Sequence, residues 1–111
     1  MSEELIEEVE LTIKQAKEAV ELKDSVLKLQ KNKDFKAVIN EGYFEKQASR
    51  LVLLKADPSM QSERDQKEID NNIIAIGYLR QYLSTLVQLG YKAEREVVDA
   101  EQAREEIVAE S

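Results

Sequence analysis

The sequence predicts an all-α protein in which a long first helix, a short middle helix and a long C-terminal helix form an extended helical hairpin or three-helix bundle. One proline and three glycines in 111 residues leave long stretches without a helix breaker. Charged residues make up 35% of the chain and hydrophobic residues 42%, a mixture typical of amphipathic helices. Aliphatic residues near both ends also recur at heptad-like intervals, which indicates helices that pack against other helices.

The first helix is expected to run from about residue 3 to residue 31. Ser2 is a candidate N-cap, and the glutamates after it lie at the positive end of the helix dipole. The apolar residues recur at intervals of three and four, and they are Ile6, Val9, Ile13, Ala16 and Val20, with Leu27 one heptad later. Because one amphipathic helix cannot bury its own apolar stripe, the pattern predicts a partner helix from this chain or from another.

The middle helix is expected at residues 34–56. We expect Asn32 to end the first helix and Asp34 to cap the next one. The middle helix should end before Asp57, because Pro58 disfavours helical geometry at the residue that precedes it. Gly42 interrupts the pattern, either as a kink or as a close approach between helices. The aromatic residues of this segment are expected to form the small core, with an exposed docking surface as the alternative, and they are Phe35, Tyr43 and Phe44.

The last helix is expected at residues 62–110, with Ser62 as its cap and Glu63 and Asp65 in the first turn. Its apolar stripe consists of Ile69, Ile73, Ile76, Leu83, Val87, Gly90 and Val97. This stripe is longer than the rest of so short a chain can cover, so the end of the helix is expected to project unless a partner supports it. Gly90 also allows a bend. We expect residues 1–111 to form a single helical domain.

The composition indicates a protein that is not an enzyme. The sequence contains no histidine and no cysteine, which excludes catalytic triads, thiol nucleophiles and imidazole metal ligands. A glycine-rich phosphate loop is also absent from the sequence. Glutamates spaced four apart, such as Glu3 with Glu7 and Glu101 with Glu105, are best explained as solvated helix faces. We therefore expect no catalytic residue, no cofactor and no metal.

The charge distribution indicates protein partners. The formal net charge is −7, and the sequence shows no basic face that would attract phosphate groups. Direct nucleic-acid binding and binding to an anionic membrane surface are therefore not expected. The acidic N-terminus is unlike a signal peptide, and the least charged stretch, residues 71–91, is too polar to span a membrane. These observations favour a soluble protein in a cytoplasm.

The candidate protein-binding residues lie on the last helix, and they are Tyr78, Arg80, Tyr82, Val87 and Val97. Tyrosine provides a large contact area at a small entropic cost, so the two tyrosines are candidate interface anchors. The alternative places them at the edge of the core, with their hydroxyl groups in solvent. Arg80 could pair with Glu41 or Glu45 within the domain, or with a group of a partner.

Three segments followed by an acidic tail carry a resemblance to a known group of proteins: residues 29–35 (LQKNKDF), 41–52 (EGYFEKQASRLV) and 74–83 (IAIGYLRQYL). Over residues 27–105, the chain resembles small acidic coiled-coil-containing proteins encoded among the structural genes of tailed bacteriophages. The resemblance implies a phage origin and a location in the virion or the host cytoplasm. It assigns no functional residues.

The resulting hypothesis is a non-enzymatic structural or assembly protein that binds other virion subunits through its helical stripes. A homo-oligomer is compatible with the same stripes. The alternative is a small acidic phage-encoded regulator that binds and inhibits a host protein.

Overall fold

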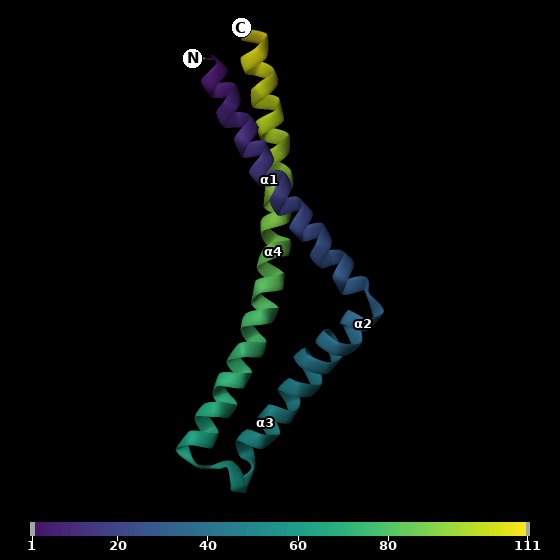
Figure 1. Cartoon of the computed structure of the whole chain (residues 1–111), viewed down its shortest axis with the longest axis vertical. Helices are drawn as coiled ribbons and strands as arrows, with labels where there is room; N and C mark the ends of the chain where they lie inside the picture. Colours follow the sequence, from purple (N-terminus) through teal and green to yellow (C-terminus); the bar gives the residue numbers. More distant parts are fainter. Residues whose placement is uncertain (1, 111) are drawn as a thin grey trace. The chain divides into compact units, whose positions relative to one another are not determined.

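The computed structural model describes residues 2–110, and within that range it contains helices and no strand. The elements, shown in Figure 1, are α1 (Ser2–Lys31), α2 (Lys33–Phe35), the π-helix η1 (Lys36–Gln47), α3 (Ala48–Ala56), the 3₁₀ turn η2 (Pro58–Met60) and α4 (Glu63–Glu110). The predicted all-α fold with long first and last helices is confirmed. No helix in the described range is both long enough and apolar enough to cross a membrane.

The chain forms two compact units. The hairpin unit contains residues 2–27 and 85–110 of the described range, and the central unit contains residues 28–84. Helix α4 therefore contributes its first part to the central unit and its second part to the hairpin unit.

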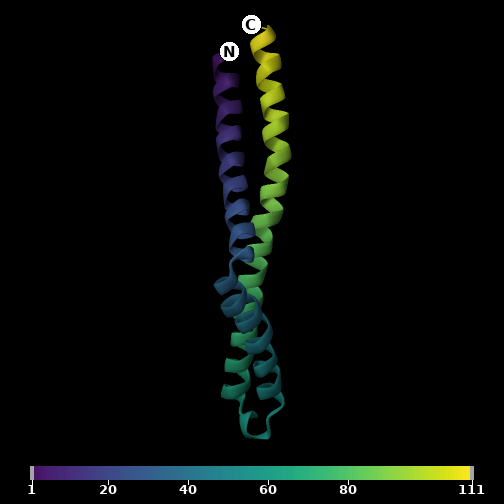
Figure 2. The same cartoon turned by 90° about the vertical axis from the view of Figure 1, so that its right-hand side faces the viewer.

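In the hairpin unit, α1 and the C-terminal part of α4 lie side by side and antiparallel (Figures 1 and 2). Ion pairs connect Lys23 to Glu94 and Lys17 to Glu101, so advancing along α1 corresponds to moving back along α4. The buried residues are mostly small or aliphatic, and they are Ile13, Ala16, Lys23, Val26, Gly90, Ala93 and Ala100. Alanine and glycine at a helix contact allow the two backbones to approach closely.

The core of the central unit consists of Leu51, Ile69 and Ile76, of which Leu51 is only 2% exposed. Half-buried residues pack around this core, and they are Tyr43, Phe44, Ala48, Leu54, Met60 and Ile73. The rings of Tyr43 and Phe44 are tilted, with their centroids 6.0 Å apart. Two of the three aromatic residues expected in the core therefore pack against it, and Phe35 is half-buried.

The break between α1 and α2 is capped by a different residue from the one predicted. The Asn32 side-chain oxygen accepts a hydrogen bond of 2.9 Å from the backbone N–H of Phe35. Asn32 has extended backbone geometry and is the N-cap, whereas Asp34 lies within the first turn of α2. The prediction that Asp34 caps this helix is wrong, because the asparagine side chain already satisfies the free N–H group.

The turn between α3 and α4 is fixed by side chains that bond to the backbone. The carboxylate of Asp57 accepts hydrogen bonds from the hydroxyl of Ser59 at 2.7 Å and from its backbone N–H at 2.8 Å. The hydrogen bond from the Ser59 hydroxyl has the larger effect and that from its backbone N–H the smaller, and together they lower the pKa of Asp57 below its ordinary value. The Ser62 hydroxyl accepts from the backbone N–H of Asp65 at 3.0 Å, which agrees with its expected role as the cap of α4.

Gly42 lies within the π-helix η1, where an added Cβ would be close to the backbone of the same helix. A π-helix closes hydrogen bonds between residues five apart, so its backbone is wider than that of an α-helix. A Cβ atom added at Gly42 would lie 3.0 Å from the carbonyl oxygen of Ala37, five residues earlier. The close contact at this glycine is therefore with the backbone of the same helix.

Candidate protein-binding surfaces

The two predicted tyrosines lie on an exposed face of α4 within the central unit. Tyr78 is 68% exposed and Tyr82 is 58% exposed, and Ile74, one turn before Tyr78, is 49% exposed. Because the three residues are spaced four apart, they lie along the same side of the helix. We call Ile74, Tyr78 and Tyr82 the tyrosine face. More than half of each tyrosine is accessible, so the rings as well as the hydroxyl groups can contact a partner.

Arg80 is also exposed on this stretch of α4. In the part of the chain that the structure describes, it forms no ion pair with Glu41 or Glu45. Its guanidinium group therefore keeps its five donors available for solvent or for a partner carboxylate.

The two predicted valines belong to the hairpin unit, where Val87 and Val97 are both half-buried. Val97 lines a groove of about 440 Å³ together with Val20 and Val98. The polar residues at this groove are Lys17, Glu21 and Glu94. We call it the valine groove. The sequence analysis placed Val20 and Val97 on the apolar stripes of two different helices but did not identify Val98, and the three valines become neighbours only when α1 and α4 pair.

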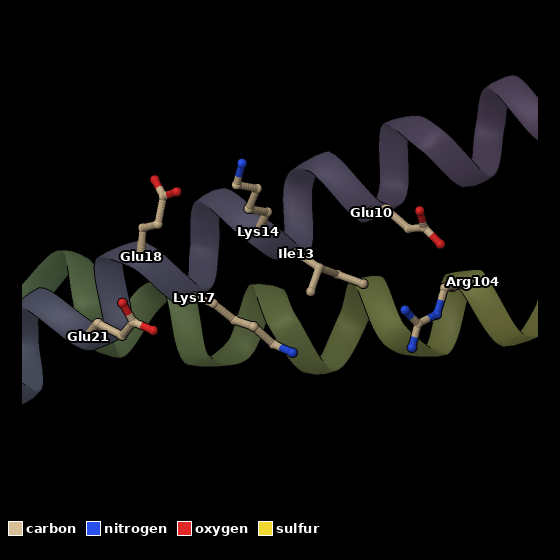
Figure 3. Close-up of a pocket in the computed structure, with 7 residues that line it drawn as sticks. All are labelled: Glu10, Ile13, Lys14, Lys17, Glu18, Glu21 and Arg104. Carbon is tan, nitrogen blue, oxygen red and sulfur yellow. The ribbon is translucent and has the colours of Figure 1, made fainter.

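A second groove in the hairpin unit has a different character (Figure 3). Its volume is about 460 Å³, and it is lined by Glu10, Ile13, Lys14, Lys17, Glu18, Glu21 and Arg104. Ile13 and Lys17 extend from α1 towards α4, whereas Lys14 and Glu18 point away from it (Figure 3). With three carboxylates and three cations, the lining has no net charge to select a ligand.

The hairpin unit also buries a charged residue that sequence reasoning missed. Lys23 is only 4% exposed, because it lies in the contact between α1 and α4. Its Nζ forms ion pairs with Glu94 and, at 3.3 Å, with Asp24. The same ammonium group lies 4.6 Å from the centroid of the Tyr91 ring, a cation–π distance. Burying an ammonium group is costly unless it is paired, and these three contacts compensate for the lost hydration.

Gly90 provides the space for the aliphatic part of Lys23. A Cβ atom added at Gly90 would lie 2.1 Å from the Cβ and 2.7 Å from the Cγ of Lys23. The close approach that glycine permits here is between α1 and α4. The signal for this site was heptad spacing, since Lys23 follows Ala16 by seven residues. Because lysine is charged, Lys23 was not counted as part of the apolar stripe of the first helix.

We expect Lys23→Met to change the free energy of unfolding by less than about 1 kcal/mol, because methionine has a similar length and needs no charge partner. Lys23→Glu should cost about 3–5 kcal/mol, since it places a carboxylate against Glu94 and Asp24. Urea unfolding followed by circular dichroism measures both changes. The matched controls are Lys14→Met and Lys14→Glu on the exposed side of α1, which should each stay within about 0.5 kcal/mol. A tolerated Lys23→Glu variant would show that this residue is not in the helix contact.

The described residues contain no group of three or more histidine, cysteine, aspartate or glutamate residues arranged to hold a metal ion. No family model matches the sequence, and comparisons with curated proteins and with solved structures return no match.

Proposed function

We propose that this chain is a non-enzymatic protein-binding subunit that attaches to other protein subunits through the tyrosine face of α4. The observation that carries the proposal is the exposure of Ile74, Tyr78 and Tyr82 along one side of a helix. Contiguous apolar and aromatic surface of this kind is characteristic of protein–protein contacts, where tyrosine often contributes much of the binding energy. Arg80 on the same stretch supplies a cation that can bind a partner carboxylate.

The packing of the central unit supports the same conclusion. The described part of the unit buries three aliphatic residues, and they are Leu51, Ile69 and Ile76. The tyrosine face exposes as many large apolar side chains as this core buries. A partner that covers the face would remove this apolar surface from water and gain the corresponding hydrophobic free energy.

We further propose that the partners are structural subunits of a tailed-phage particle, so that the chain acts in the virion or in the host cytoplasm. The support for this part is the resemblance of residues 27–105 to small acidic coiled-coil-containing phage proteins. The exposed helix faces are compatible with such a role, because particle components contact several neighbours.

The second candidate function is a small acidic regulator that binds and inhibits a host protein. The observation that favours it is the segregation of charge between the two units. The hairpin unit contains 15 aspartate and glutamate residues against 6 lysine and arginine residues, a net charge of −9. The central unit contains 8 acidic and 10 basic residues, a net charge of +2. Binding by the acidic hairpin would weaken steeply with ionic strength.

The double variant Tyr78→Ala/Tyr82→Ala tests the first function. We expect it to keep the helical content of the chain and to lower the affinity for the natural partner at least about tenfold, since interface tyrosines often contribute more than 1 kcal/mol each. The tagged chain would be recovered from the cell in which it acts, its partners identified by mass spectrometry, and their affinity measured with purified proteins. Leu53→Ala is the matched control, because Leu53 is 73% exposed on α3 of the same unit.

Recovery of a portal, capsid or tail protein, with binding lost in the tyrosine variant, would support the assembly role. Recovery of a host enzyme without any virion protein would contradict it and favour the regulator. Charge reversal at Glu101, Glu105 and Glu106 separates the two functions further. The triple substitution should leave the affinity for the partner nearly unchanged if assembly uses the tyrosine face. It should greatly lower that affinity if an inhibitor acts through the acidic hairpin.

A further inference from the structure

We infer that the valine groove of the hairpin unit is a docking site for a basic amphipathic helix of another protein. The groove lies between α1 and α4, with Val20, Val97 and Val98 as its apolar lining. This surface is separate from the tyrosine face, which belongs to the central unit. The inference therefore does not depend on the proposed function of that face.

The pairing of the two helices explains why the valines come together. Lys23 pairs with Glu94, so Val20, three residues before Lys23, lies level with Val97, three residues after Glu94. Val98 follows directly and is 64% exposed. An apolar strip at the junction of two antiparallel helices is the surface on which a third helix packs, with side chains at positions i, i+3, i+4 and i+7.

The charge of the hairpin unit determines the kind of helix. Carboxylates outnumber cations by 15 to 6. Three of those cations are already paired with carboxylates of the same unit: Lys17 with Glu101 at 3.9 Å, Lys92 with Glu96 at 3.9 Å, and Lys23 with Glu94. The excess of carboxylates gives the hairpin unit a negative net charge, which favours lysine and arginine on the incoming helix.

The same charge argues against a second copy of this hairpin as the occupant. Two hairpins with a net charge of −9 each would bring like charges together along the whole contact, which opposes association at physiological ionic strength. Of the charged residues at the groove, Lys17 is paired with Glu101 and Glu94 with Lys23. Glu21 is exposed and places its carboxylate where a lysine of the incoming helix can reach it. A helix with a leucine stripe flanked by lysines matches this arrangement of apolar and acidic groups.

Titration calorimetry of the full chain with a synthetic three-heptad peptide tests the inference. The probe has leucine at the apolar positions and lysine elsewhere, and the control peptide replaces each leucine by alanine while keeping every lysine. We expect the leucine–lysine peptide to bind with 1:1 stoichiometry and at least about tenfold more tightly than the control, because the groove recognises the apolar side chains.

Matched variants locate the binding on the protein. Val98→Asp should weaken binding of the leucine–lysine peptide at least about tenfold, and Glu21→Lys should weaken it and reduce its salt dependence. Val98 and Glu21 are both exposed, so circular dichroism should show that neither substitution changes the helical content. Leu53→Asp, at a 73% exposed position of the central unit, should bind like the unmodified chain.

Equal affinity for both peptides would show non-specific charge attraction and overturn the inference. Unchanged binding by Val98→Asp would place the peptide elsewhere and overturn it too. Sedimentation equilibrium of the chain alone completes the test. If the unmodified chain is a dimer and the Val98→Asp variant a monomer, a second copy of the chain is the occupant and the inference is overturned. We expect both the unmodified chain and the variant to be monomers.

Discussion

Replacing Gly90 by alanine is expected to destabilise the hairpin unit by about 1–3 kcal/mol, although alanine is the better helix former. The added Cβ would lie 2.1 Å from the Cβ of Lys23, and this near-backbone part of the side chain cannot rotate away. The helices must separate locally, which also weakens the contacts of the Lys23 ammonium group with Glu94 and Tyr91. Amide hydrogen exchange of α1, measured by mass spectrometry, reports the loss of stability within the hairpin unit.

Gly77→Ala is the matched control, because it is the same substitution in the same helix. An added Cβ at Gly77 meets no atom within 4 Å, so the variant should gain about 0.5–1 kcal/mol from the higher helix propensity of alanine. The two substitutions should therefore change stability in opposite directions. If both variants were stabilised equally, α1 and α4 would not approach each other at Gly90.

Leu51→Ala should lower the free energy of unfolding of the central unit by about 2–5 kcal/mol. Leu51 is 2% exposed and lies in one cluster with Ile69 and Ile76, so its removal leaves a cavity that the neighbouring side chains fill only in part. Urea unfolding followed by circular dichroism measures the change in midpoint.

Leu53→Ala provides the control for this experiment, since Leu53 belongs to the same helix α3 and is 73% exposed. Its effect should stay within about 0.5 kcal/mol. Similar losses for both leucines would mean that α3 packs through a different face, and the assignment of the core would be wrong.

The helices themselves were predictable because their signals are local. Heptad spacing, the scarcity of glycine and proline, and the turn at Asp57-Pro58 predicted long first and last helices with a shorter helical segment between them. The cap at Ser62 was predictable for the same reason, since a serine hydroxyl before an acidic first turn satisfies a free backbone N–H. The cap between α1 and α2 was not predictable, because Asn32 and Asp34 are both suitable cap residues and only the backbone geometry decides between them.

The features that sequence reasoning missed depend on contacts between distant residues. Lys23 is charged, so the sequence does not predict its burial. Gly90 provides space for its side chain, and Tyr91 and Glu94 contact its ammonium group. Gly90 alone suggested a bend, whereas the structure gives it a close contact with another helix. The valine groove likewise needs residues of both α1 and α4. Tyr78 and Tyr82 were predicted to share one side of the last helix, because residues four apart are neighbours on a helix, whereas Ile74 was added by its exposure in the structure.

Hydroxyl-radical footprinting of Tyr78 and Tyr82 tests the proposed binding surface most directly. The oxidation rate of each tyrosine would be compared between the isolated chain and the chain in its natural assembly. Both side chains are more than half exposed in the chain alone, so a partner that covers them should lower their oxidation severalfold, while Leu53 stays unchanged. Unchanged oxidation of both tyrosines in the assembly would contradict the proposal that this face binds other subunits.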